Sequence, residues 1–136
     1  SGGYMIAKHF EEQGYKNFGI VSGPGDAVDA AFRKNGFVDH ISEKKDLELV
    51  WEFKGDFSSE SGRDAFKNFK KQSLSNIAIF GCNDHTCFGF MKSAIEAGYK
   101  APLTTRVTLN MMHFDGREVG RSPRVLRCRM FRAYTF

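Results

Sequence analysis

Short apolar runs alternate along this chain with longer segments in which apolar residues recur at helical spacing. Four runs have the continuous or alternating apolar pattern of strands: Phe18–Val21, Leu47–Phe53, Ile77–Phe80 and 107–112. The segments between them predict helices over 4–13, over 27–43, from Ser58 or Ser59 to about residue 71, and over 85–97. Gly14 and Gly98 suit the left-handed conformation that closes a helix, and a serine at 58 or 59 suits a helix N-cap.

This order of elements predicts the fold class. Strands that are separated by helices of this length join by right-handed crossovers and form a parallel sheet that is covered on both faces. We therefore predict an α/β fold, a three-layer sandwich with a mainly parallel sheet of about four or five strands. The alternation in Leu47–Phe53 favours a place near the sheet edge. Residues 121–136 fit the scheme poorly and form either an extended segment or a basic tail.

Composition and charge narrow the function classes. The chain has 136 residues, of which 41% are hydrophobic and 26% charged, as is typical of one soluble globular domain. No apolar run approaches the roughly 20 residues that span a bilayer, and no signal peptide is recognisable. Because the three cysteines suit reduced thiols in the core, we expect a cytoplasmic protein without membrane contact. The net charge of +4 is concentrated in residues 116–136, where six arginines accompany one acid. The rest of the chain is nearly neutral and offers no basic face for nucleic acid.

Residues with reactive or metal-binding side chains form no recognisable catalytic or metal motif. Cys82, Cys87 and Cys128 include no CxxC pair, and we expect them to be reduced thiols in the core. The four histidines show neither HxH nor HExxH spacing, so we expect no metal and no cofactor. A stand-alone enzyme that uses Asp84, His85 or Asp115 is an alternative that no motif demands.

The strand ends carry the candidate ligand site. In open parallel sheets, ligands bind beyond the carboxyl ends of the strands. Eight side chains are predicted at or near this edge: Asp26, Asp29, Arg33, Asp56, Phe57, Asn83, Asp84 and Asp115. Carboxylates and amides bind hydroxyl groups, arginine supplies a rigid fork of donors, and an aromatic face covers the C–H side of a sugar ring. The alternative is that Asp and Asn at strand ends only cap helices and turns.

Several segments also match one family pattern in order and spacing. They are Gly2-Gly3-Tyr4 with His9-Phe10 and Gly14-Tyr15, Phe18 to Pro24, Arg33 to Phe37, Gly55-Asp56-Phe57 with Ser61-Gly62, Ile77 to Asp84, Ala94 to Gly98, and Val107 to Asp115. These segments resemble the ligand-binding core of the lactose/galactose-repressor family, which shares its fold with periplasmic sugar-binding proteins. The resemblance covers about residues 2–123, and it departs from the family pattern at Met112-His113 and Gly116.

The resemblance implies a function and a set of site residues. It implies one lobe of a type I periplasmic-binding-protein-like fold, the carboxyl-terminal lobe over residues 1–120, with residues 121–136 as a basic tail or a strand that returns across the hinge. It implies effector contacts at Arg33, Phe57, Asn83 and Asp115, with Asp29 as a further contact. The expected function is binding of a small, sugar-type effector within a transcriptional regulator, without catalysis. A homodimer is expected for the full-length protein, with DNA bound only through a headpiece that this chain lacks.

Two further functions remain open at this point. The same lobe could belong to the periplasmic sugar-binding protein of an ABC transporter, although the few cysteines are those of a reducing compartment. Alternatively, apolar surface that another lobe normally covers could drive self-association, which the fourteen phenylalanines make plausible.

Overall fold

The computed structural model describes residues 2–74, 76–99, 111–115 and 127–131, and it describes the last two ranges by their backbone alone. The four helices are α1 (Gly2–Glu12), α2 (Val28–Ser42), α3 (Ser59–Lys71) and α4 (Asp84–Glu96). The five strands are β1 (Asn17–Ser22), β2 (Glu48–Lys54), β3 (Ile77–Gly81), β4 (Met111–Asp115) and β5 (Arg127–Phe131). The predicted helices and the first three predicted strands are confirmed, and each predicted end lies within two residues of the observed end.

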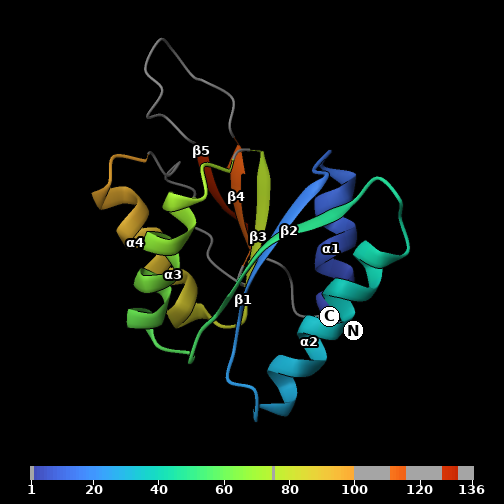
Figure 1. Cartoon of the computed structure of the whole chain (residues 1–136), viewed down its shortest axis with the longest axis horizontal. Helices are drawn as coiled ribbons and strands as arrows, with labels where there is room; N and C mark the ends of the chain where they lie inside the picture. Colours follow the sequence, from blue (N-terminus) through green and yellow to red (C-terminus); the bar gives the residue numbers. More distant parts are fainter. Residues whose placement is uncertain (1, 75, 100–110, 116–126, 132–136) are drawn as a thin grey trace.

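One five-stranded sheet forms the middle of three layers. Its strand order is β2-β1-β3-β4-β5, so β2 is an edge strand, as its alternating sequence predicts. Helices α1 and α2 cover one face and α3 and α4 cover the other (Figure 1). The predicted α/β sandwich with a mainly parallel sheet is therefore confirmed.

The sheet direction changes after β3. Strands β2, β1 and β3 are parallel, whereas β4 runs antiparallel to β3 and β5 runs antiparallel to β4. The expectation that the fourth strand continues the parallel pattern is therefore wrong. Strand β5 shows that residues 127–131 form an extended segment of the same sheet, while residues 100–110, 116–126 and 132–136 lie outside the described part of the chain.

Strand periodicity divides the core into two clusters. Phe18 and Ile20 of β1 pack with Phe10 and Phe37 beneath α1 and α2. Val21, on the opposite face of β1, packs with residues from α3 and α4, among them Phe66 and Phe90. Because neighbouring residues of a strand point to opposite faces, a wholly apolar β1 requires both faces to be covered.

Strand β2 changes phase part-way along its length. Its register with β1 shifts between Phe18, which pairs with Leu49, and Gly19, which pairs with Trp51. Leu49 therefore packs on the side of α1 and α2, whereas Trp51 and Phe53 pack on the side of α3 and α4. A single extra residue is enough to invert the faces of the rest of the strand.

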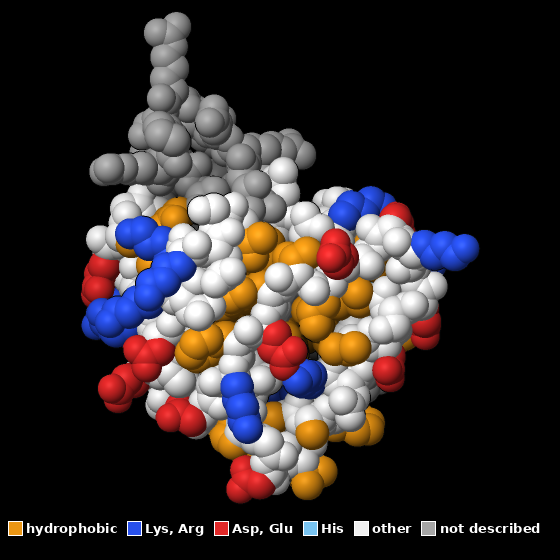
Figure 2. All heavy atoms as spheres, in the orientation of Figure 1, with side chains coloured by type: hydrophobic (Ala, Val, Ile, Leu, Met, Phe, Trp, Pro, Cys, Tyr) orange, Lys and Arg blue, Asp and Glu red, His pale blue; other side chains and the backbone are white. Residues whose placement is uncertain are grey.

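Helix α4 buries one stripe and exposes another. Cys87, Phe90, Met91 and Ala94 are buried at helical spacing, but Phe88 is 62% exposed. A residue one position along a helix points about 100° away from its neighbour, so Phe88 lies outside the stripe to which Cys87 belongs. Charged side chains lie around apolar patches on the face that Figure 2 shows. Within the described residues, no helix is long and apolar enough to cross a bilayer.

Glycines allow the helices on each face to approach closely. A Cβ at Gly89 of α4 would overlap the backbone carbonyl of Ser59, and a Cβ at Gly62 of α3 would overlap that of Thr86. On the other face, a Cβ at Gly3 of α1 would overlap the carbonyl of Arg33. Backbone atoms cannot move aside as a flexible side chain can, so these glycines set the distance between paired helices.

We predict that Gly89→Ala lowers the free energy of unfolding by about 1–3 kcal/mol, because overpacking forces α3 and α4 apart. In an unpacked helix the same substitution is stabilising by up to about 1 kcal/mol. Gly2→Ala is the matched control, since nothing lies within 4 Å of a Cβ at Gly2. Urea unfolding measures both, and equal midpoints for the two variants would contradict the close approach of the helices.

Candidate functional site

The carboxyl ends of β1, β2 and β3 meet at one edge of the sheet, which we call the rim (residues 22–33, 54–58 and 82–84). Backbone hydrogen bonds join its loops: the amide of Gly55 donates to the carbonyl of Ser22 at 2.7 Å, and the amide of Cys82 donates to the carbonyl of Val21 at 3.0 Å. The rim therefore has a fixed backbone on which side chains from three loops converge.

Arg33 reaches the rim from the second turn of α2. Its Nη1 donates a hydrogen bond of 3.0 Å to the carbonyl of Cys82, at the end of β3. This bond places the guanidinium between the helix that follows β1 and the loop that follows β3. The fork of five donors keeps hydrogens for a ligand after one is used.

Asn83 is the N-cap of α4 and also a contact between loops. Its Oδ1 accepts a hydrogen bond from the amide of Thr86 at 3.0 Å, and its Nδ2 donates to the carbonyl of Phe57 at 2.8 Å. The alternative that rim Asn residues cap helices is thus confirmed for Asn83. One N–H and one lone pair of its side chain are left for a ligand.

Phe57 occupies a conformation that phenylalanine rarely adopts. Its φ is +74°, in the left-handed region, where a bulky side chain is strained by about 1–3 kcal/mol. The half-buried ring lies against the loop after β1, because a Cβ at Gly23 would be 2.5 Å from Cε1 of Phe57. One side of the ring is thus supported by protein.

Asp56 shapes the turn that carries Phe57. Its Oδ1 accepts hydrogen bonds from the hydroxyl of Ser58 at 2.5 Å and from the amide of Ser58 at 2.9 Å. These two bonds, of which the one from the hydroxyl has the larger effect, hold the pKa of the Asp56 carboxyl below its ordinary value. The Asp56 carboxylate therefore stabilises the turn.

Ser58 is the N-cap of α3, as predicted, because its hydroxyl oxygen accepts a hydrogen bond from the amide of Ser61 at 3.0 Å.

The two remaining predicted effector contacts lie in different places. Asp29 is exposed in the first turn of α2, on the same helix face as Arg33 four residues later, and so belongs to the rim. Asp115 does not. It ends β4, where Phe114 is paired with Ile77 at the beginning of β3. Since each strand residue advances about 3.3 Å, Asp115 lies roughly 15 Å or more along the sheet from Asn83, at the opposite edge.

The prediction that Asp115 shares the rim is therefore wrong. Its physical basis was that the strand before Asp115 runs parallel to β3, and that strand runs antiparallel.

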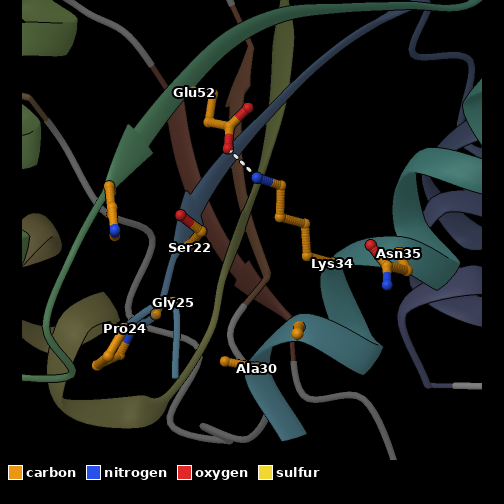
Figure 3. Close-up of a pocket in the computed structure, with 10 residues that line it drawn as sticks. Ser22, Pro24, Gly25, Ala30, Lys34, Asn35 and Glu52 are labelled. Atoms are coloured by element: carbon orange, nitrogen blue, oxygen red, sulfur yellow. Dashed lines mark hydrogen bonds and ion pairs between the residues drawn. The ribbon is translucent and has the colours of Figure 1, made fainter. Parts of the chain in front are cut away.

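A hollow of about 290 Å³ lies at the rim, where the loop after β1 meets α2 and the end of β2. It is lined by Ser22, Gly23, Pro24, Gly25, Ala30, Ala31, Lys34, Asn35, Glu52 and Lys54. Figure 3 shows Lys34 of α2 and Glu52 of β2 pointing toward one another, and their side chains form an ion pair. Sequence reasoning missed these charged residues, because no local pattern shows that α2 folds back over β2.

Metal and thiol chemistry find no support in the described part of the chain. No group of three or more His, Cys, Asp or Glu residues there could hold a metal ion. Cys82 and Cys87 are buried thiols, as predicted, and burial raises the pKa of the Cys82 thiol. A thiol with a raised pKa is a poor nucleophile.

Comparison with known proteins shows the relatives of this chain. No protein-family model matches it. It is 31% identical over 102 residues to the HTH-type transcriptional repressor PurR of Mannheimia succiniciproducens. The aligned stretch covers 74% of this chain and 30% of that repressor. PurR of Salmonella paratyphi B gives 31% over 103 residues, 75% of this chain and 30% of the repressor. Its homologues are repressors of the PurR/LacI family.

Solved structures agree with this LacI-family relationship. A dimeric Lac repressor with a C-terminal deletion superposes with a TM-score of 0.65 at 20% identity, over 76% of this chain and 41% of the repressor. A periplasmic solute-binding protein of an ABC transporter from Actinobacillus succinogenes, with bound D-allose, superposes with a TM-score of 0.61 at 22% identity. The match covers 76% of this chain and 40% of that protein. A Mycobacterium smegmatis protein in complex with β-D-fucofuranose superposes with a TM-score of 0.62 at 30% identity, over 76% of this chain and 34% of that protein.

The fold is thus that of a LacI-type effector-binding lobe, and the predicted family resemblance is confirmed. The homologues are repressors and not enzymes. The chain spans about 30% of the length of the curated repressors that it matches.

We predict that Asn83→Ala destabilises this LacI-type lobe by about 1–2 kcal/mol, because it removes an N-cap and releases the Phe57 carbonyl. Asn83→Asp costs less, since a carboxylate keeps the capping acceptor and favours a helix N-terminus. His85→Ala, an exposed neighbour on the same helix, serves as the control. If urea unfolding gives Asn83→Ala the stability of His85→Ala, the structural role of Asn83 is refuted.

Proposed function

We propose that this lobe binds a small, hydroxyl-rich effector of sugar type as part of a transcriptional regulator. The observation that carries the proposal is the convergence of Arg33, Phe57 and Asn83 at one edge of the sheet, where hydrogen bonds through the Cys82 and Phe57 carbonyls hold them. The relationship to PurR repressors supports the regulatory role. The sugars bound to two structural neighbours support the ligand class.

Each rim side chain has a distinct role in this proposal. Arg33 donates hydrogen bonds to ligand oxygens, and Asn83 offers its remaining N–H and lone pair. Asp29 accepts from ligand hydroxyls. The open side of the Phe57 ring packs on the C–H face of the ligand, which is the contact that aromatic side chains make with sugars. None of these roles is catalytic.

The rest of the regulator lies in the whole protein. We propose that it acts in the cytoplasm and binds DNA through a separate headpiece, and that effector binding shifts the balance between two arrangements of its lobes. The D-allose-binding neighbour of the ABC transporter favours one alternative, a lobe of a periplasmic sugar-binding protein. A helix-turn-helix encoded upstream supports the regulator, and a signal peptide supports the alternative.

We predict that Arg33→Ala and Phe57→Ala weaken effector binding by the full-length protein. A charge-assisted hydrogen bond contributes about 1.5–3 kcal/mol, so Arg33→Ala should raise the Kd at least about tenfold. Thermal shift with a panel of sugars and purines, beginning with D-allose and D-fucose, identifies a stabilising compound, and titration gives its Kd. The matched control is Lys45→Ala, which removes an exposed positive charge before β2, at the opposite edge of the sheet.

Unchanged affinity in both Arg33→Ala and Phe57→Ala would refute the rim as the effector site. Melting temperatures without ligand separate lost binding from lost folding, which matters because Arg33 also bonds the Cys82 carbonyl.

We also propose that the full-length protein is a homodimer with α4 in its interface. Phe88 and Ile95 of α4 are 62% and 52% exposed, and seven residues of spacing place them on the same helix face. Large apolar side chains exposed together commonly mark an interface. The dimeric Lac repressor neighbour supports a second copy of the chain as the partner.

We predict that Phe88→Ser shifts the full-length protein from dimer to monomer at micromolar concentration. The substitution removes apolar area from the proposed interface without touching the core. Sedimentation velocity measures the change, with Phe32→Ser, an equally exposed phenylalanine of α2, as the control. A dimer that survives Phe88→Ser unchanged excludes this face of α4.

A further inference from the structure

The ring of Phe57 rests on Gly23, in the loop after β1. A Cβ at Gly23 would lie 2.5 Å from Cε1 and 2.8 Å from Cζ of this ring, and 2.8 Å from Cβ of Ala30 in α2. Distances under 3.0 Å are shorter than carbon atoms tolerate, so no side chain fits at position 23 while the ring is in place. The ring and the Ala30 methyl group together fill the volume that a side chain would need.

Backbone conformation does not explain this choice of residues. Gly23 is absent from the residues with positive φ, so its backbone is one that other amino acids adopt freely. Phe57, in contrast, has a φ of +74°, where glycine or asparagine is favoured. The chain thus has glycine where the backbone does not require it and phenylalanine where the backbone disfavours it. The packing of the Phe57 ring and the Ala30 methyl group accounts for the glycine.

The strained backbone of Phe57 is held from two sides. The side-chain Nδ2 of Asn83, the N-cap of α4, donates to the Phe57 carbonyl at 2.8 Å. On the preceding side, Asp56 accepts from the amide and hydroxyl of Ser58 and so closes the turn around Phe57. With its backbone held in this way, the ring lies against the surface of Gly23.

We propose that Gly23 is a positioning residue of the effector site: because it lacks a side chain, it seats the Phe57 ring at the depth from which its open side meets the ligand. The ligand part of this inference rests on the proposed function, whereas the seat is a property of the lobe itself. A side chain at position 23 lifts the ring into the space of the ligand and selects against bulky sugars. Position 23 therefore determines specificity without contacting the ligand.

Methyl NMR of the lobe tests the seat without any ligand. Alanine methyl groups are labelled with ¹³C, and the Ala30 resonance is assigned by its loss in Ala30→Gly. An aromatic ring beside a methyl group shifts its resonance, and Phe57→Leu gives the position without that ring. We expect Gly23→Ala to move the Ala30 resonance at least halfway to its position in Phe57→Leu. Gly25→Ala is the matched control, since a Cβ there meets only the end of the Lys54 side chain, at 3.4 Å.

An Ala30 resonance that stays at its wild-type position in Gly23→Ala would overturn the proposal. If Gly23→Ala does not fold, a double-mutant comparison takes the place of this measurement. Thermal unfolding then compares Gly23→Ser in the wild-type background and in the Phe57→Ala background. We expect a clearly smaller loss of Tm in the second, and equal losses would count against the seat.

Binding by the full-length protein separates this inference from the proposed function. With D-allose and D-fucose as probes, we expect Gly23→Ala to weaken whichever sugar Phe57→Ala weakens, by at least tenfold, while Lys45→Ala, outside the rim, leaves its binding unchanged. Weaker binding in Phe57→Ala with unchanged binding in Gly23→Ala overturns the positioning role. Unchanged binding in Phe57→Ala itself refutes the stacking role of the ring, and with it the proposed function of this residue.

Discussion

Burial of β1 on both faces is the constraint on which the rest of the structure depends. Phe18 and Ile20 are fully buried beneath α1 and α2, and Val21 is fully buried beneath α3 and α4. A strand that is apolar on both faces is stable only in the middle of three layers. Because β1 pairs in parallel with both β2 and β3, its central place also brings the carboxyl ends of all three strands to one edge.

That edge combines structural roles and proposed ligand-binding roles in the same side chains. Asn83 caps α4 and fixes the Phe57 carbonyl, and Arg33 links α2 to the end of β3. Side chains that are already held by the fold lose little conformational freedom when a ligand arrives, which favours affinity. The strained backbone of Phe57 fits the same account, since strain persists where the surrounding structure over-determines it.

The candidate site is only one side of what a two-lobed binding protein would use. The chain covers about 30% of the curated PurR repressors, and about 40% of the Lac repressor and periplasmic neighbours. A ligand held between lobes receives contacts from both of them, so in the proposed function the rim supplies the contacts of one lobe. The hollow at the rim is lined by an ion pair and mostly by short side chains.

Local patterns in the sequence predicted the elements, the layers and the place of four rim residues, Asp29, Arg33, Phe57 and Asn83. Helical and strand periodicity are local properties, so the helices, the first three strands and the Ser58 cap are readable from neighbouring residues. Arg33, Phe57 and Asn83 follow parallel strands, and parallel pairing places such ends together. Only the tertiary structure decided the place of Asp115, the exposure of Phe88 and the contact between Gly23 and Phe57. Strand direction, helix phase and ring packing depend on which distant segments meet, and local periodicity carries no information about those meetings.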